Sequence, residues 1–255
     1  MKRWTLVVVC AATAMLMLDI AVVNTALSRI AEDLNTGLSG LQWVVDAYTL
    51  ALASVVLTAG ALADRFGRRR LFAIGLVVFT VSSAACAAAT DIVFLDVARA
   101  VQGLGGAVMF AVSLAILADA FPNPRERAGA LAAYGATIGG TFAIGPLVGG
   151  ALTSGLDWQW IFLINIPLGI ACLWITRRYV RESRDPATPP VDWAGQAALV
   201  AGSSRSASRS SRSPPWPAGS RRTSRCSTRR APCRASAPRS CSPSRWPCWP
   251  TPIRT

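Results

Sequence analysis

The sequence Gly60-Ala-Leu-Ala-Asp64-Arg65-Phe-Gly67-Arg68-Arg69-Arg70 decides the fold, because it concentrates charge and glycine at the junction of two apolar stretches. Those stretches, residues 41–63 and 71–89, are each long enough to cross about 30 Å of hydrocarbon at about 1.5 Å per residue. The segment is therefore predicted to turn at the water boundary, and its arginines favour the cytoplasmic side. Short cytoplasmic loops often collect arginines, but the glycines, the aspartate and their spacing make this pattern more specific.

The composition indicates a polytopic membrane protein with an unusual tail. The 255 residues have a mean hydropathy of +0.40 and contain no histidine. A formal net charge of +13 would be typical of a protein that binds nucleic acid. Residues 1–202, however, hold 14 basic and 13 acidic side chains. Nearly all of the basic excess therefore lies in the last 53 residues, and the two parts need separate explanations.

Six complete spans are predicted, followed by a seventh that starts near Asp192. The spans are residues 5–27, 41–63, 71–89, 92–118, 129–154 and 160–176. Residues 1–184 would form one six-span unit, and residues 185–202 a linker with the start of the seventh span. Lysine and arginine gather in the connections on one side, which predicts a multi-pass protein of the plasma (inner) membrane with a cytoplasmic amino terminus. A cleaved signal peptide is the weaker alternative, because the first span is long and contains Asp19.

Two charged residues inside the spans are candidates for function, since charge within a membrane is costly. Asp19 and Arg99 each lie about 12 Å from the external end of their span, at about 1.5 Å per residue. At a common depth they could face one central cavity, where protonation of the acid would rearrange the pair. The alternative is that Arg99 pairs with Asp96 on its own helix and that Asp19 is hydrated in a vestibule.

The quoted loop resembles the signature loop of the major facilitator superfamily at every motif position. This resemblance implies that Gly60 allows close helix approach and that Asp64 caps or pairs with a neighbouring helix end. The arginines would form interhelical contacts that hold one access state closed. The implied cytoplasmic gating loop consists of Gly60, Asp64, Arg65, Gly67, Arg68 and Arg69.

Two further segments resemble the fourteen-span drug:proton antiporters of this superfamily. Residues 18–27 (LDIAVVNTAL) are similar to their first-helix motif, although Ser28 stands where proline is usual. Residues 99–107 (RAVQGLGGA) are similar to their fourth-helix motif. Asp46, near Trp43, either joins the same polar path or is hydrated at the interface. The implied proton and substrate path consists of Asp19, Asn24, Arg99, Gln102 and Asp46.

The fifth span carries the sequence 139–150 (GGTFAIGPLVGG), which predicts close packing through glycine and a bend at proline. It resembles the antiporter motif of exporters, formed here by Gly145, Pro146, Gly149 and Gly150. Residues 158–167 (WQWIFLINIP) resemble the entry to the sixth helix, with Gln159 in place of a common arginine. Aromatic anchoring at the external boundary also explains the two tryptophans. Residues 191–195 resemble the start of the seventh helix.

The tail, residues 203–255, contains 12 arginines, 14 serines and 9 prolines but no acidic residue. Proline ends helices, and arginine at this density opposes insertion in hydrocarbon, so disorder is predicted. We favour a shifted reading frame, because Leu-Val-Ala runs in GC-rich codons read one base over give Ser, Arg, Pro, Trp and Cys. A functional tail that binds RNA or anionic lipid is the alternative.

Together these patterns predict an all-α membrane protein, the six-helix half of a major facilitator fold with an inverted 3+3 repeat, and not an enzyme. The chain has no phosphate-binding loop and no metal-ligand spacing, so no cofactor is expected and a proton gradient would supply the energy. The implied activity is efflux of amphipathic or cationic compounds by proton antiport, inactive in a lone half. The alternatives are a carrier of a sugar or secreted metabolite, and a non-transporting module that self-associates or needs a partner half.

Overall fold

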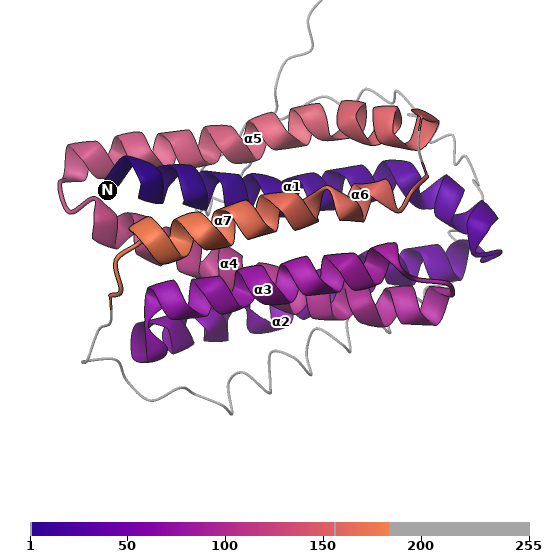
Figure 1. Cartoon of the computed structure of the whole chain (residues 1–255), viewed down its shortest axis with the longest axis horizontal. Coiled ribbons are helices and arrows are strands. Elements are labelled where there is room, and N and C mark those ends of the chain that lie inside the picture. The colour runs from indigo at the N-terminus through magenta and orange to yellow at the C-terminus, as the bar shows by residue number, and fades with distance from the viewer. Residues whose placement is uncertain (1, 156, 184–255) are drawn as a thin grey trace, which may run out of the picture. The chain divides into compact units, whose positions relative to one another are not determined.

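The computed structural model describes residues 2–155 and 157–183, which belong to one compact unit (Figure 1). The predicted linker after residue 184, the seventh span and the tail lie outside the described residues. Within the described part every regular element is a helix. The helices are α1 (Lys2–Asp33), α2 (Leu38–Phe66), α3 (Arg68–Ala87), α4 (Ile92–Ala120), α5 (Pro124–Gly155), α6 (Trp160–Leu163) and α7 (Asn165–Tyr179).

The described residues form six helical segments long and apolar enough to cross a membrane, which confirms the predicted fold class. The last of these combines α6 and α7, which are separated at Ile164. Pro167 explains the break, because its ring has no N–H and clashes with the carbonyl of Leu163. Most helices also run past the predicted spans: α1 continues to Asp33, where Arg29 and Glu32 are exposed. Polar residues beyond the hydrocarbon still favour the helix.

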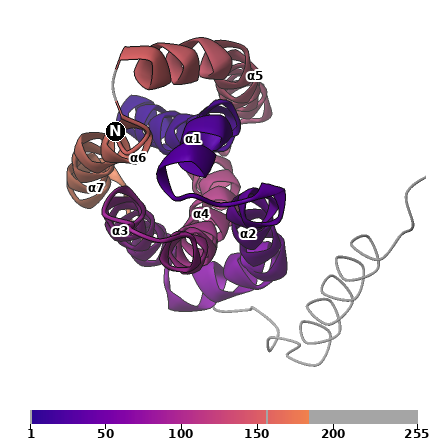
Figure 2. The same ribbon diagram turned by 90° about the vertical axis from the view of Figure 1, so that its right-hand side faces the viewer.

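The two central helices, α1 and α4, pack against each other and divide the remaining helices between them (Figure 2). Helices α5 and α7 lie against α1, and helices α2 and α3 lie against α4, while α3 also touches α7. The contact pattern maps onto itself when α1, α2 and α3 are exchanged with α4, α5 and the segment formed by α6 and α7. Related triplets would produce this pattern, and the predicted inverted repeat remains a prediction.

Burial is uneven among the helices. In an apolar 18-residue stretch of each helix, 56% is buried in α1 and in α4, against 17% in α2 and 11% in α5. Glycines of α4 permit close packing: a Cβ on Gly105 would collide with the backbone nitrogen of Phe79, and one on Gly103 with the carbonyl oxygen of Tyr48. The low burial of α2 and α5 means that one face of α2 and most of α5 have no protein neighbour among the described residues.

Candidate functional site

Asp19 of α1 and Arg99 of α4 form a buried ion pair between the two central helices. The Nη1 group of Arg99 donates to Oδ2 of Asp19 at 2.6 Å, and the exposed fractions of the two side chains are 2% and 0%. The alternative, an ion pair of Arg99 with Asp96 on its own helix, is not found among the described residues, because the guanidinium donates to Asp19 of α1. Both charged groups are enclosed by packed side chains of the described helices, and the predicted central cavity remains a prediction.

Arg99 is held by more than its carboxylate partner. Its Nη1 also donates to Oε1 of Gln102 at 2.7 Å, and its Nε donates to the carbonyl oxygen of Val44 at 3.3 Å. The guanidinium carbon lies 4.1 Å from the ring centroid of Tyr48 and 5.7 Å from that of Phe162. Aromatic faces attract a cation, so the two rings add to the ion pair in compensating burial of the charge.

The second carboxylate oxygen of Asp19 accepts hydrogen bonds from two amides. Nε2 of Gln102 donates to Oδ1 at 3.0 Å, and Nδ2 of Asn165 donates to the same atom at 3.2 Å. Both amides also donate to Oγ of Ser83, at 3.1 Å from Gln102 and 3.0 Å from Asn165. Hydrogen bonds from neutral donors favour the ionised carboxylate. The network therefore joins α1, α3, α4 and α7 around one charged oxygen pair.

Sequence reasoning missed Ser83, Tyr48 and Asn165, and two residues of the predicted path, Asn24 and Asp46, are not part of this buried network. Asn24 is exposed and donates to the carbonyl oxygen of Ile20 on its own helix. Asp46 is also exposed, and it forms no ion pair within the described part of the chain. Asn165 stood in a quoted motif, and its polarity inside an apolar span was the signal that could have found it.

The loop from Gly60 to Arg70 forms a network of charges at the other end of the bundle. Gly67 connects α2 to α3 with a φ of 107°, a conformation that favours glycine. Asp64 pairs with Arg68 at 2.7 Å, and Arg68 lies 3.8 Å from Asp119 of α4. The loop thus joins three helices through charge.

Two further arginines of this loop hold the segment that follows α7. Oε1 of Glu182 accepts from the backbone nitrogen of Arg69 at 3.1 Å, and its Oε2 lies 3.6 Å from Nε of Arg70. Arg65 is exposed and lies against the ring of Phe66. The implied close helix approach at Gly60 is not found among the described residues, since a Cβ there would have no neighbour within 4 Å.

Two of the four antiporter-motif residues, Gly145 and Gly149, lie where α5 packs closely against α1. A Cβ on Gly145 would collide with the Cβ of Ala21, and a Cβ on Gly149 would collide with Oγ1 of Thr25. Gly150 has open space around it, and Pro146 lies exposed within a continuous helix. Close packing through glycine thus involves one face of the motif.

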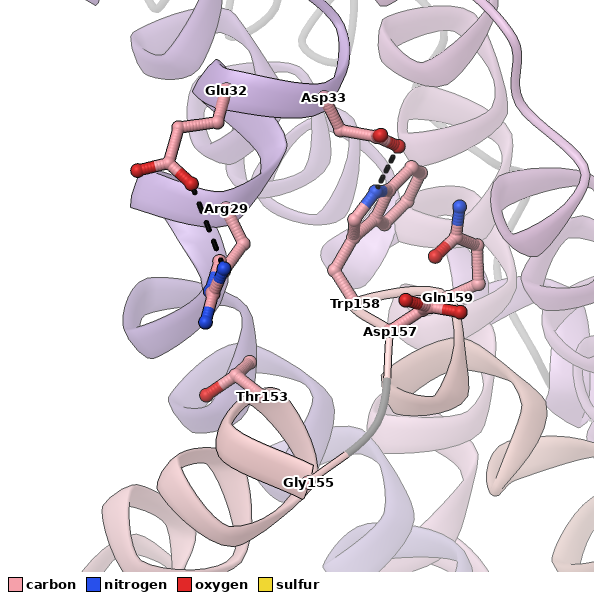
Figure 3. Close-up of a pocket in the computed structure, with 8 residues that line it drawn as sticks. All are labelled: Arg29, Glu32, Asp33, Thr153, Gly155, Asp157, Trp158 and Gln159. Carbon is pink, nitrogen blue, oxygen red and sulfur yellow. Dashed lines mark hydrogen bonds and ion pairs between the residues drawn. The ribbon is translucent and has the colours of Figure 1, made fainter.

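A cleft of about 740 Å³ lies between the end of α1 and the segment that joins α5 to α6 (Figure 3). Trp158 is 3% exposed and its Nε1 donates to Oδ2 of Asp33 at 2.8 Å, so this tryptophan is packed inside the protein and is not an interfacial anchor. Trp160 is exposed. The cleft residues are Arg29, Glu32, Asp33, Thr153, Gly155, Asp157, Trp158 and Gln159.

The arrangement of these helices is that of a membrane transporter. It is similar to the crystal structure of a bacterial homologue of the human lysosomal transporter Spinster in an inward-facing conformation, with a TM-score of 0.61, 18% identity and coverage of 74% of this chain and 45% of that one. A peptide transporter structure gives a TM-score of 0.63, with 15% identity and coverage of 81% and 44%. These likenesses show the fold.

The family model described as Major Facilitator Superfamily matches residues 9–235, and the chain belongs to this family. The matched interval extends past residue 202, into the segment for which a shifted frame was predicted, and that interpretation remains a prediction. Members of this family are transporters, so the expectation that the chain is not an enzyme is confirmed.

Curated relatives confirm the resemblance to drug exporters. The chain is 41% identical over 186 residues to the drug efflux pump JefA of Mycobacterium tuberculosis (strain H37Rv), covering 73% of this chain and 37% of JefA. It is 42% identical over 183 residues to the puromycin resistance protein pur8 of Streptomyces alboniger, covering 72% and 36%. The chain thus spans little more than a third of the length of these relatives.

Proposed function

We propose that the six-span unit is one half of a proton-coupled exporter of amphipathic, often cationic compounds, oriented with its amino terminus in the cytoplasm. The observation that carries this proposal is the enclosed pair of Asp19 and Arg99 between the two central helices. A buried charge pair is weak evidence for stability, because desolvation offsets the attraction between the charges. Its place at the centre of a transporter fold, and the similarity to drug efflux proteins, favour a role in transport.

Protonation of Asp19 would supply the coupling step. The ionised carboxylate compensates the charge of Arg99, and a neutral acid would leave that cation buried without an anion. The bundle would then favour an arrangement in which Arg99 finds water or another anion. An equilibrium between two access states would in this way depend on one proton.

The charged loop between α2 and α3 would act as the cytoplasmic gate. The pairs of Arg68 with Asp64 and Asp119 connect α2, α3 and α4 at one end of the bundle. Movement of one helix relative to the others would separate these partners, so the pairs favour one access state. Exposed pairs are each worth about 0–1 kcal/mol, and the effect depends on several of them acting together.

A second proposal concerns what packs against the exposed faces of α2 and α5. The exposed apolar faces of α2 and α5 favour either self-association of the chain or pairing with a separate half. Transport of a sugar or a secreted metabolite remains the alternative substrate class. Compounds that accumulate in cells lacking the protein would separate drug export from metabolite export.

The test is efflux of a fluorescent cationic dye, driven by a proton gradient, from cells expressing this chain. Asp19→Asn removes the titratable group, and Glu126→Gln is a matched control at an exposed carboxylate. Loss of efflux in the first variant alone would support proton coupling through Asp19 and show that the unit works without a covalent second half. Efflux that persists in Asp19→Asn would contradict the proposal.

Absence of efflux from both the unaltered chain and its variants, with membrane insertion verified, would favour the inactive half. The next step would then be to search the other reading frames of the gene downstream of Gly202 for the rest of a transporter. Finding no such sequence would count against the shifted frame.

A further inference from the structure

The amide of Asn165, next to Asp19, has a nitrogen that donates hydrogen bonds and an oxygen that accepts none from the described residues. Its Nδ2 donates to Oδ1 of Asp19 and to Oγ of Ser83. Its Oδ1 is buried and accepts no hydrogen bond from the described residues. The residue is 1% exposed, so the idle oxygen is costly unless it is used in another state of the protein.

Protonation of the Asp19 carboxylate would change which hydrogen-bond partners this site requires. Oδ2 of Asp19 is held by Arg99 at 2.6 Å, so a proton arriving from water would bind Oδ1. That oxygen receives N–H groups from Gln102 and Asn165, and once protonated it becomes a donor facing two donors. Rotation of one of the two amides, so that its oxygen replaces its nitrogen, would supply an acceptor for this O–H group.

Gln102 is not free to do so. Its Oε1 already accepts from Nη1 of Arg99 at 2.7 Å and from the thiol of Cys86 at 3.6 Å. Rotation of this amide would turn its N–H groups toward the guanidinium, which has donors only. Asn165 has no such commitment, because its oxygen is idle.

Rotation of the Asn165 amide would leave no neighbour without a partner. Ser83 would lose one donor, but its oxygen would still accept from Nε2 of Gln102 at 3.1 Å and its hydroxyl would still donate to the carbonyl oxygen of Phe162 at 3.3 Å. Asn165 is the first residue of α7, next to the helix break at Ile164, so its side chain stands where α7 meets α1 and α3.

We propose that Asn165 is an amide switch that reports the protonation state of Asp19. Its nitrogen donates to the carboxylate, and after protonation at Oδ1 the amide rotates so that its oxygen accepts the new O–H group. Asn165 is thus a positioning residue that transmits protonation from α1 to α7. This inference rests on the proposed function, in which Asp19 binds the coupled proton.

The other charged or titratable groups that face Asp19 include no second carboxylate. They are Arg99 from α4, Tyr48 from α2 and Cys86 from α3, all of them buried. Helix α5 buries one titratable residue, Tyr134, and α7 brings the Asn165 amide to this place. None of these groups is a second carboxylate, so a carboxyl signal that titrates here would come from Asp19.

The chain allows a direct measurement, because it contains only four asparagines: Asn24, Asn35, Asn123 and Asn165. The purified full chain would be prepared with asparagine that carries a heavy isotope at the side-chain carbonyl carbon. Infrared difference spectra across a pH series would follow the labelled carbonyl bands and the carboxyl band that Asp19→Asn removes. A carbonyl that gains a hydrogen-bond donor absorbs at lower frequency.

The switch predicts that one labelled band moves to lower frequency at the same midpoint as protonation of Asp19. This shift should be lost in Asn165→Leu and in Asp19→Asn. It should remain in Thr176→Val, a matched control at a buried polar residue of α7 whose hydroxyl donates to the carbonyl oxygen of Cys172. If Asn165→Leu does not fold, Asn165→Ser also removes the amide carbonyl, and the comparison with Asp19→Asn assigns the shift independently.

Two results would overturn the inference and are distinguishable from each other. Titration of the Asp19 carboxyl without movement of any labelled band would refute the switch and leave proton coupling through Asp19 intact. A carboxyl that does not titrate across the series would refute both the switch and the proposed coupling.

Discussion

Arg99 is the residue on which the buried network depends, because one guanidinium serves an acid, an amide oxygen, a backbone carbonyl and an aromatic ring. Desolvation of this charge is compensated only while all these partners remain. The same residue therefore sets both the stability of the half and its response to a proton. These two effects can be separated by the substitutions chosen.

Removing the cation alone should be worse than removing both charges. Arg99→Gln leaves the Asp19 carboxylate buried without its counter-ion and should lower the free energy of unfolding by about 3–5 kcal/mol. Combining it with Asp19→Asn leaves two neutral polar groups and should restore much of that loss. Size-exclusion chromatography of the heated, detergent-solubilised protein measures the folded fraction. A double variant no more stable than Arg99→Gln would contradict a dominant charge effect.

Keeping the charge but changing its shape should also matter. Arg99→Lys cannot bond Asp19, Gln102 and the Val44 carbonyl together, nor stack its head group flat on Tyr48. Loss of one or two of these hydrogen bonds predicts about 1–3 kcal/mol lower stability. Arg177→Lys, at an exposed arginine of α7, is the matched control and should behave as the unaltered chain. Equal thermal stability of the two variants would show that charge alone is required.

At the scale of helices, small residues decide how closely each element approaches its neighbour. Gly145 places α5 against Ala21 of α1, while Gly150, five residues later, has no contact for a Cβ. Both positions are glycines of the same sequence motif. Only the side of α5 on which each glycine lies distinguishes them, and this depends on tertiary packing.

Gly145→Ala should therefore destabilise the half and Gly150→Ala should not. The added methyl at residue 145 meets a rigid Cβ, so overpacking should cost about 1–3 kcal/mol. At residue 150 the same change should be neutral or stabilising by up to about 1 kcal/mol, because alanine favours a helix more than glycine does. Thermal unfolding of both variants, compared with the unaltered chain, checks the difference in sign. Similar losses at the two positions would refute the assigned packing face.

The turn between α2 and α3 depends on backbone conformation. Gly67 has a φ of 107°, which a residue with a Cβ adopts only with strain, so Gly67→Ala should cost about 1–3 kcal/mol. Gly60→Ala, in the interior of α2 with open space around it, is the control for stability and should cause no loss. Thermal unfolding again measures both. A tolerated Gly67→Ala would mean that the turn adopts a different conformation.

For the molecule as a whole, the sequence predicted what hydrophobic length and charge determine and missed what packing determines. The six spans and the shared depth of Asp19 and Arg99 followed from residue counts along helices. The contacts of Ser83 and Asn165 could not be predicted from sequence, because they depend on which faces of α3 and α7 meet α1, although the polarity of Asn165 inside an apolar span marked it as a candidate. Asn24 was placed in the path by its motif, but it lies five residues after Asp19, which is not a whole number of turns at about 3.6 residues per turn, and its side chain is exposed.

Orientation in the membrane is a property of the whole chain and remains to be measured. The connections near Lys2, Arg68, Arg125 and Arg177 are rich in cations, which predicts that this end of the bundle faces the cytoplasm. Epitope insertion at Thr36, between α1 and α2, should therefore be detected by antibody on intact cells. The matched insertion at Asn123, between α4 and α5, should be detected only after permeabilisation.

This pair of insertions tests more than topology. The proposed gate around Asp64 lies at the same end as Asn123, since Arg68 contacts Asp119 of α4. An epitope at Asn123 exposed on intact cells would place that charged loop outside and remove its role as a cytoplasmic gate. It would also contradict the proposed orientation of the chain, and with it the proposed direction of transport.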